Sequence, residues 1–395
     1  MVNNLYRYEI EAVYTNGEDI VEILPESISS ITTNYNYDKN NMPILYMSFN
    51  VKSDLYDDMV VNIETARIIL TIKKYDKKAT SMLSRIFIRR EFSYLMETDP
   101  DYHKPLDKLN SPREASPTSY KKGTIALIDS ELLDNAKRLY NDIIKNSNMI
   151  SIVHKYTNHM NMIIEPFTNN DNIDCLIVPP ISSIKDLLKF LNEYSCFYNK
   201  GYRYFRDFDK SYLLSNEGNP VPGNYEEYNT MVIEIMDTTE IESKNAGIFT
   251  DNNKHTYVMQ IDALKTHMDI NIVRNKEYNS IIGVTSTGDT RKINLSLTPE
   301  NAKEKVALCR VCNDNLRYMD NIKTDLDSSS VVLQISNTEI DSSIITPNKE
   351  YIIKNYKEYS EYNGRFILSS KRDIFIQQDK EFISNTILVF RKILD

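Results

Sequence analysis

The segment from Asp174 to Leu214 constrains the fold more than any other part of this sequence, because an apolar run, a double proline, a helical pattern and an aromatic run follow one another. Apolar residues recur there at helical spacing: Ile184, Leu187, Leu188, Leu191, Tyr194 and Phe197. The spacing predicts an amphipathic helix over residues 183–198 with one buried stripe. The polar residues between them are expected to face water: Lys185, Asp186, Asn192 and Glu193.

The ends of this helix are marked by local signals. Ser183 and Asp186 are typical of a helix start, because their side chains can accept hydrogen bonds from backbone N–H groups that lack a partner there. Gly201 is expected to end the helix. Residues 202–214 are then predicted to return as one strand, against which Leu187, Leu188 and Leu191 pack.

Two carboxylates in this predicted strand deserve a functional reading. One strand face would carry Arg203, Phe205, Asp207 and Asp209, and the other Tyr202, Tyr204, Arg206 and Phe208. Asp207 and Asp209 would lie roughly 6–7 Å apart, within reach of the spacing in inverting glycosidases. Arg203 and Arg206 are close enough to pair with them, and the sequence has no Trp to stack on a sugar, so a structural role is favoured.

The segment resembles the baseplate hub proteins of contractile-tailed bacteriophages and related contractile injection particles. The residues that carry the resemblance are Pro179, Pro180, Leu187, Leu191, Asn192, Tyr194, Phe197, Tyr198, Gly201, Phe205, Asp207, Phe208, Asp209, Tyr212, Leu213 and Leu214. Ser195 and Cys196 stand where that family often has a glycine after the tyrosine. The chain length, 395 residues, is also similar to that of a stand-alone hub protein.

The resemblance implies a structural protein of the virion tail and no enzyme. It implies a homotrimer, assembled in the host cytoplasm, that joins the sixfold tail tube or its tube-initiating ring above to the threefold central spike protein below. Each chain would carry two β-barrels similar to the tube subunit, and the trimer would form part of the DNA conduit. Baseplate wedge or tape-measure proteins are further expected partners. The alternative functions are a tail-associated cell-wall hydrolase or peptidase and a non-viral binding module.

Composition limits the partners of the chain. The formal net charge of -9 argues against a surface that neutralises phosphates, so DNA would pass without specific binding. No run of about 18 apolar residues predicts a membrane span, and the N-terminus lacks the pattern of a signal peptide. Four cysteines, at positions 175, 196, 309 and 312, are too sparse for a disulfide framework, which favours a reducing compartment.

The pattern along the chain predicts an α+β, mainly β fold with three parts. The first antiparallel β-barrel is expected over 1–125, with an exposed proline-rich loop at 98–123, a mixed helical middle region over 126–222, and a second barrel over 223–395 with an insertion at about 240–325. Strands are predicted at 6–14, 20–23, 44–51, 62–72, 84–92, 228–235, 257–261, 292–297, 331–335, 351–356, 364–368, 373–377 and 386–390. Further helices are predicted at 130–145 and 299–312.

The remaining candidate residues indicate no catalytic, cofactor or metal site. Cys309 and Cys312 form a CxxC, but the sequence offers neither a second CxxC nor a nearby His pair to complete a zinc site. His154 and His159 cannot converge on one ion from a helix or a strand, so both are interpreted as surface residues. Gly283 and Gly288 are interpreted as parts of a hairpin. No nucleophile elbow, HExxH, P-loop or dinucleotide fingerprint is present.

Overall fold

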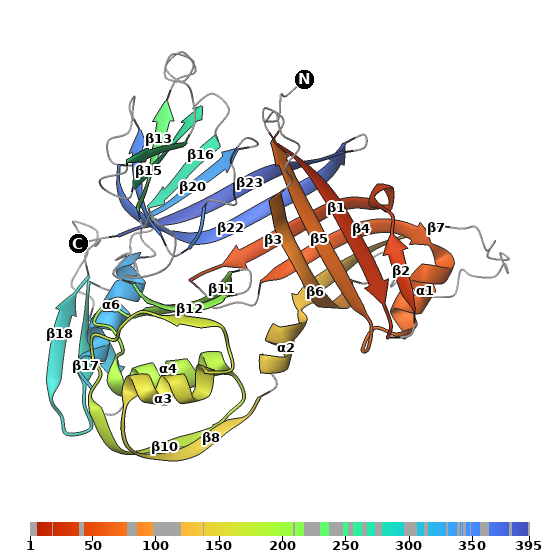
Figure 1. Ribbon diagram of the computed structural model, residues 1–395. Coiled ribbons are helices and arrows are strands. Elements are labelled where there is room, and N and C mark those ends of the chain that lie inside the picture. The colour runs from red at the N-terminus through yellow and green to blue at the C-terminus, as the bar shows by residue number, and fades with distance from the viewer. Residues whose placement is uncertain are drawn as a thin grey trace, which may run out of the picture.

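The computed structural model shows a mainly β protein in which strands dominate and the few helices are short (Figure 1). It describes residues 6–393 except 18, 39–42, 77–84, 98–119, 137, 208–209, 217–229, 237–247, 252–255, 263–266, 273–278, 296–305, 312–314, 329–330, 338–339, 341, 343–344, 348, 356–362 and 379–380. The helices are α1 (Ser53–Val61), α2 (Ser130–Ala136), α3 (Met149–Thr157), α4 (Ile184–Ser195) and α6 (Tyr318–Ser328), besides the 3-10 turn η1 (Pro25–Ser27).

Fifteen of the described strands form one large sheet. They are β1 (Tyr6–Thr15), β2 (Ile20–Ile23), β3 (Ile28–Asn36), β4 (Ile44–Lys52), β5 (Arg67–Asp76), β6 (Arg85–Glu97), β7 (Tyr120–Asp129), β13 (Thr230–Met236), β14 (Ile248–Asp251), β15 (Thr256–Asp262), β16 (His267–Ile272), β20 (Val331–Asn337), β21 (Glu350–Asn355), β22 (Gly364–Gln378) and β23 (Glu381–Lys392). Their order is β14-β15-β13-β21-β22-β3-β4-β7-β6-β5-β1-β23-β20-β16, with β2 beside β1. The N-terminal and C-terminal strands therefore share one hydrogen-bonded sheet.

The long hairpin β22–β23 links the two halves of this sheet. The first half of β22 pairs with β21, and after a register shift between Leu368 and Ser370 its second half pairs with β3. Strand β23 pairs with β20 along its second half and with β1 at Phe382. Consequently the pairings β22-β3-β4-β7-β6-β5-β1-β23 return to β22 and form a closed circuit.

The N-terminal strands follow the predicted alternation. Tyr8, Ile10, Ala12 and Tyr14 are buried on one face of β1, and β2 returns beside β1 as a hairpin with Thr15 opposite Ile20. Their core also contains Phe375 and Phe382 from the hairpin β22–β23. Burial of the apolar face against residues from the opposite end of the sequence therefore fixes the register of this half.

The middle of the chain forms a separate layer around α3 and α4. A two-stranded sheet, β8 (Tyr140–Asn148) and β10 (Asn172–Ile181), lies on one side of these helices, and a three-stranded sheet lies on the other (Figure 1). The second sheet consists of β9 (Met162–Ile164), β12 (Lys210–Ser215) and β11 (Tyr202–Asp207). The apolar stripe of α4 joins side chains from both sheets in one core.

A small unit that we call the insertion module lies beside the end of α4. It consists of β17 (Ser280–Val284), β18 (Thr290–Asn294), β19 (Val306–Arg310) and α6. The core of the module contains Ile281, Ile293, Leu295, Val311 and Met319 and is distinct from the core beneath α4. As predicted, Gly283 and Gly288 belong to a hairpin, β17–β18, in which Gly288 adopts a positive φ of 91°.

Two predicted helices are wrong in whole or in part. The helix predicted at 130–145 ends at Ala136, and β8 follows it, because Tyr140 and Ile144 point into the core while the backbone of β8 pairs with β10. The described part of 299–312 contains no helix. Its residues from Val306 to Arg310 form β19, which pairs in parallel with β17, so strand pairing overrides the helical pattern there.

Several predicted boundaries also change. Residues 202–214 form the hairpin β11–β12 instead of one strand, whereas the strands predicted at 364–368 and 373–377 are one continuous strand, β22. The strand predicted at 62–72 begins only at Arg67, after α1. The end of the loop predicted at 98–123 belongs to β7, and the boundary at residue 125 falls inside that strand. Residues 98–119 lie outside the described residues.

Candidate functional site

Helix α4 is the centre of the segment that carries the family resemblance, and its first turn forms as predicted. The backbone N–H of Asp186 donates to Ser183 Oγ at 3.1 Å, and Ser183 Oγ donates to Asp186 Oδ2 at 2.7 Å. Leu187, Leu188 and Leu191 are fully buried. They share a core with Tyr204 of β11, in agreement with the predicted packing against the strand after Gly201, and with residues of α3 and β10.

The last turn of α4 ends at a residue with an unusual backbone. Cys196 has a φ of 52° in the left-handed region, which costs a residue with a Cβ roughly 1–2 kcal/mol. The N–H of Phe197 donates to Asn192 Oδ1 at 3.1 Å, and the N–H of Cys196 donates to the Asn192 carbonyl at 2.7 Å. A glycine would adopt this conformation without strain, so the structure gives a reason for the glycine that hub proteins often have near this position.

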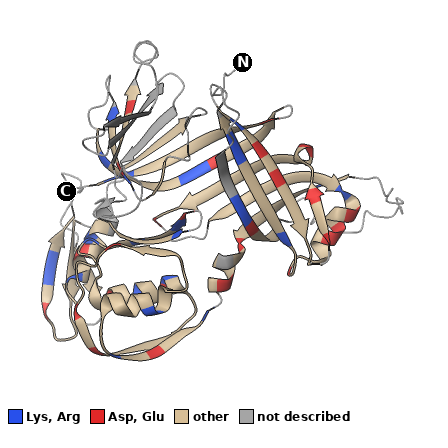
Figure 2. Ribbon diagram, in the orientation of Figure 1, with Lys and Arg blue, Asp and Glu red and all other residues tan. Residues whose placement is uncertain are grey.

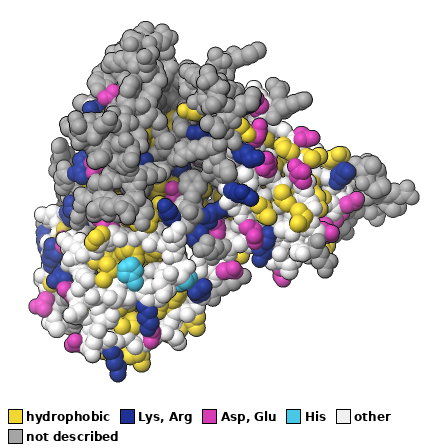
Figure 3. All heavy atoms as spheres, viewed as in Figure 1, with side chains coloured by type: hydrophobic (Ala, Val, Ile, Leu, Met, Phe, Trp, Pro, Cys, Tyr) yellow, Lys and Arg dark blue, Asp and Glu magenta, His cyan; other side chains and the backbone are white. Residues whose placement is uncertain are grey.

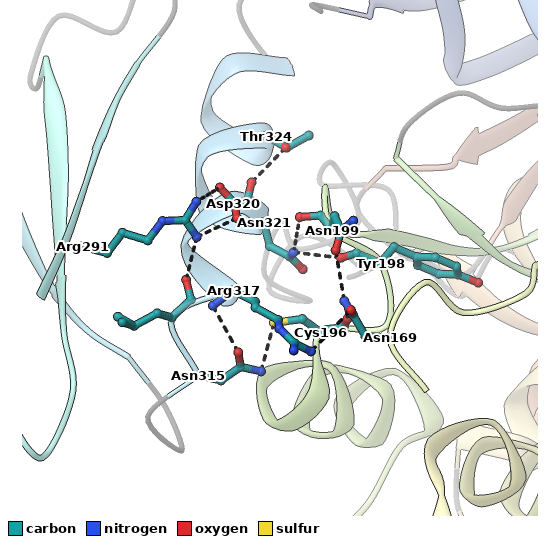
Figure 4. Close-up of polar contacts among 11 residues, drawn as sticks. Asn169, Cys196, Tyr198, Asn199, Arg291, Asn315, Arg317, Asp320, Asn321 and Thr324 are labelled. Carbon is teal, nitrogen blue, oxygen red and sulfur yellow. Dashed lines mark hydrogen bonds and ion pairs between the residues drawn. The ribbon is translucent and has the colours of Figure 1, made fainter. Parts of the chain in front are cut away.

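Asparagine side chains connect this helix end to the insertion module, and we call these contacts the amide joint (Figure 4). Asn192 Nδ2 donates to Asn321 Oδ1 of α6 at 3.1 Å. Asn321 Nδ2 in turn donates to the carbonyls of Tyr198 and Asn199, both at 3.0 Å. Asn315 Nδ2 donates to the Tyr194 carbonyl at 3.1 Å. All four of these hydrogen bonds therefore join an uncharged amide donor to an uncharged carbonyl acceptor.

The prediction that Asn192 faces water is wrong. Its side chain is buried and bonded to Asn321, which lies 129 residues further along the chain. One local signal for its burial is that position 192 lies four residues after Leu188 and thus next to the buried stripe. Asn315 and Asn321 carry no local signal, because their partners come from a different part of the chain.

An ion pair lies at the exposed rim of the amide joint. Arg317 Nη1 is 3.0 Å from Asp171 Oδ2 and donates to Asn169 Oδ1 at 3.4 Å. Asn169 Nδ2 donates to the carbonyl of Cys196 at 2.7 Å. Because Arg317 and Asp171 are both exposed, water and salt screen this ion pair, and the buried amides have to define the geometry of the joint.

The thiol of Cys196 points towards the module but is not an activated nucleophile. Asn315 Nδ2 lies 3.4 Å from its Sγ. Burial raises the pKa of the Cys196 thiol from 9.0 to about 12, and the nearby Arg317 only partly offsets this rise. The thiol is therefore protonated at neutral pH, whereas a catalytic cysteine needs a depressed pKa.

The other half of the same segment contacts the large sheet through buried ionic groups, which we call the charged joint. Tyr37 Oη donates to Asp207 Oδ1 at 3.1 Å. Arg206 Nη2 lies 3.9 Å from Asp129 Oδ2, and Arg90 also pairs with Asp129. Burial, followed by the charge of Asp207, raises the pKa of Tyr37 well above its ordinary value, so the phenol remains a hydrogen-bond donor.

Arg203 adds a further cation on this side of the molecule. It is buried, and its guanidinium carbon lies 5.6 Å from the centre of the Phe205 ring. Burial, followed by repulsion from Arg391, lowers the pKa of Arg203 to about 10. Arg391 itself contacts Asp38 at 3.4 Å and donates to Asn216 Oδ1 at 3.3 Å. Charged side chains from three parts of the chain therefore meet within the fold.

Among the residues that the structure describes, the predicted candidates for chemistry do not come together into a catalytic arrangement. Asp207 is buried and bonded to a tyrosine, and Asp209 and Cys312 lie outside the described residues. Cys309 lies on β19. His154 and His159 are exposed, and histidine side chains are visible on the surface in Figure 3. Within the described parts of the chain, no three His, Cys, Asp or Glu side chains form a group that could hold a metal ion.

Comparison with known proteins identifies the family. The sequence matches the family described as bacteriophage PBS1 gene 109 protein over residues 1–393. The chain belongs to that family. No curated protein matches the sequence. Among the described residues of this family member, no helix combines the length and apolar composition that a membrane span requires.

Solved tail proteins have a similar fold. A tail protein from Neisseria meningitidis MC58 is 10% identical, with a TM-score of 0.55 and coverage of 98% of this chain and 96% of that chain. The 43 kDa tail protein of prophage MuSo2 from Shewanella oneidensis is 9% identical, with a TM-score of 0.55 and coverage of 98% and 97%. A chain of the half-lidded Francisella PdpA–VgrG complex is 10% identical, with a TM-score of 0.52 and coverage of 99% and 59%. Family and fold together confirm the resemblance to phage tail proteins.

Proposed function

We propose that this chain is the structural hub of a contractile phage tail baseplate and acts as a homotrimer. The observation that carries the proposal is the extent of the likeness to the Neisseria tail protein, which includes 98% of this chain and 96% of that one. The likeness therefore extends over the whole architecture and is not limited to one common domain. At 10% identity this likeness supports a shared fold.

The arrangement of the large sheet supports two tube-like barrels per chain. The closed circuit of β22, β3, β4, β7, β6, β5, β1 and β23 would be the first barrel. The second would contain β13, β15, β16, β20 and β21 and would use the same hairpin, β22–β23. Three chains would then present six barrels, which would match a sixfold tail tube above to a threefold central spike below. The middle region, 126–222, would lie outside the ring, whereas the predicted insertion at about 240–325 would contribute β15 and β16 to the second barrel.

Charge supports a conduit through which DNA slides. The formal net charge is -9 per chain, so a trimer would carry three times that charge, about -27. Along β1, β5 and β23 residues of both signs occur (Figure 2), as in the pairs Lys73–Glu11 and Arg7–Glu381. Such a surface would not bind phosphates strongly. Tight DNA binding at physiological salt in a mobility-shift assay would contradict the conduit.

The remaining parts of the proposal concern partners and location. The protein would be assembled in the host cytoplasm and would remain in the virion tail, in contact with the tube protein or a tube-initiating ring, the spike protein, and wedge or tape-measure proteins. The likeness to a chain of a VgrG complex supports a place in a multi-protein assembly. We propose no catalytic role. A cleared zone in a cell-wall zymogram of the purified chain would favour the hydrolase alternative instead.

Light scattering coupled to size exclusion tests the assembly. A trimer has three times the 46.0 kDa of the chain, about 138 kDa. We expect this mass for the chain alone, or this mass plus that of the bound spike after addition of the spike protein from the same tail. A chain that stays at 46.0 kDa at every concentration with and without the spike, or that forms a twofold dimer, would contradict the trimer.

A further inference from the structure

The insertion module is built as a unit that can separate from the rest of the chain. Its sheet packs on α6 through a core of its own, which shares no residue with the core beneath α4. Within the module, Arg291 joins β18 to α6 by two hydrogen bonds to Asp320, at 2.7 and 2.8 Å. Gly283 lies so close to α6 that an added Cβ would be 2.8 Å from Met319 Cγ. Apolar packing and an ion pair therefore hold the module together.

The module is attached to α4 by a different kind of contact. Across the amide joint, Asn192, Asn315 and Asn321 supply neutral hydrogen bonds of 3.0–3.1 Å. Figure 4 shows the two that Asn321 donates to the carbonyls of Tyr198 and Asn199. When such a bond breaks, water can form hydrogen bonds with both the donor and the acceptor. The net contribution of these bonds to stability is therefore small compared with that of a packed core. The ion pair at the rim, Arg317–Asp171, is exposed and contributes little.

We propose that the insertion module undocks from the end of α4 as a unit, while its own core and the core beneath α4 stay folded. Polar interfaces between units of one chain usually permit relative motion, whereas large apolar ones do not. Undocking would uncover Asn192, Cys196 and the turn from Tyr198 to Gly201. The inference concerns the isolated chain and does not depend on the tail function proposed above.

Cys196 provides the probe for undocking. Its thiol is buried, and the polar groups around it, Asn315, Arg317 and Asp320, belong to the module or to the chain that leads into α6. In a variant with Cys175, Cys309 and Cys312 replaced by Ser, alkylation by iodoacetamide would report only on this thiol. Mass spectrometry would follow the labelling rate in the native protein and across a urea series.

The decisive variant is Asn321→Ala, because this side chain bonds Asn192 and the carbonyls of Tyr198 and Asn199. We expect Cys196 labelling to accelerate about tenfold or more, while the urea midpoint of global unfolding shifts little. The matched control is Thr324→Ala on the same helix, whose Oγ1 donates only to the Asp320 carbonyl of its own turn at 2.9 Å. Its labelling rate should stay within about twofold of the parent rate.

Hydrogen exchange gives the second readout. In Asn321→Ala, amides around Tyr198 and Asn321 should exchange faster, while those in β17 and in the first half of α4 keep their protection. The proposal is overturned if Cys196 labels only at the rate of global unfolding in the parent, if Asn321→Ala and Thr324→Ala label equally fast, or if β17 loses protection together with the joint.

Discussion

The segment that carries the family resemblance makes two contacts of opposite character. On one side, β11–β12 meets the large sheet at the charged joint, where buried Arg206, Asp129 and Asp207 lie among apolar side chains. On the other side, the end of α4 meets the insertion module at the amide joint, where asparagines exchange neutral hydrogen bonds. A buried charge cannot separate from its partner without a large penalty, whereas an amide can bond to water. We therefore expect the charged joint to stay closed in the folded protein and the amide joint to open.

The largest expected effect tests the permanence of the charged joint. Asp129→Asn removes the carboxylate that Arg90 and Arg206 share. Because at least Arg206 stays buried, we expect a loss of about 3–5 kcal/mol in the free energy of unfolding, measured by urea titration. Asp57→Asn, which removes an exposed partner of Lys121, is the control and should cost at most about 1 kcal/mol. Equal effects in the two variants would show that the charged joint is not a permanent contact.

The next effect concerns α4, which carries one side of the amide joint and packs against Tyr204 of β11, the strand that reaches the charged joint. Leu188→Ala in α4 removes a fully buried side chain and should cost about 2–5 kcal/mol. Lys189→Ala, at the next and exposed position, should change stability by less than about 0.5 kcal/mol. The same urea titration measures both. A loss below half a kcal/mol for Leu188→Ala would mean that the apolar stripe does not hold α4 in place. The amide joint would then not be mounted on a fixed helix.

A smaller effect is expected inside the module. Gly283→Ala would place a Cβ 2.8 Å from Met319 Cγ and 2.9 Å from Val311 Cγ2. Such overpacking should cost about 1–3 kcal/mol. The loss should appear as faster hydrogen exchange in β17 and α6 with unchanged exchange in β1. Uniformly faster exchange throughout the chain would show that the module and the large sheet unfold together.

The smallest effect uses alkaline pH to address the amide joint alone. The pKa of the Cys196 thiol is raised from 9.0 to about 12, chiefly by burial. The unfolded chain therefore releases this proton first, so the contribution to stability is complete below pH 9 and declines as the pH rises towards 12. Between pH 9 and 10 the parent should lose about 1 kcal/mol more than Cys196→Ser. Parallel losses in both proteins would show that the thiol is not buried in the folded state.

Elements fixed by local signals were predictable from the sequence. Helix α4 forms where Ser183 caps its start and leucines recur at helical spacing, and β1 follows its period of two. These features need no information about distant partners, since a cap and a stripe already determine the helix and the face it buries. The candidate segment was therefore located correctly, including its packing against Tyr204.

Features fixed by distant partners were not predictable. Residues 140–144 have a helical pattern, yet pairing with β10 makes them a strand. The sequence predicts two C-terminal strands, at 364–368 and 373–377, but between them Lys371 Nζ is buried and donates to the carbonyl of Ile345 at 3.1 Å, and β22 continues through it. Asn192 was expected to face water because nothing near it in sequence reveals Asn321. In each case the deciding contact lies elsewhere in the chain.

The hairpin β22–β23 has a consequence for the order in which the protein can fold. Tyr8 pairs with Phe382, and Ser30 to Asn36 pair with residues 370–376, so β1 and β3 can complete their pairing only when the C-terminal hairpin is present. During synthesis the edges of β1 and β3 that pair with β23 and β22 would stay unpaired until the ribosome has made the C-terminal residues. Contacts at such long sequence separation also slow folding. Nascent chains that stop before Gly364 would therefore leave one edge of β3 unpaired and would depend on chaperones to avoid aggregation.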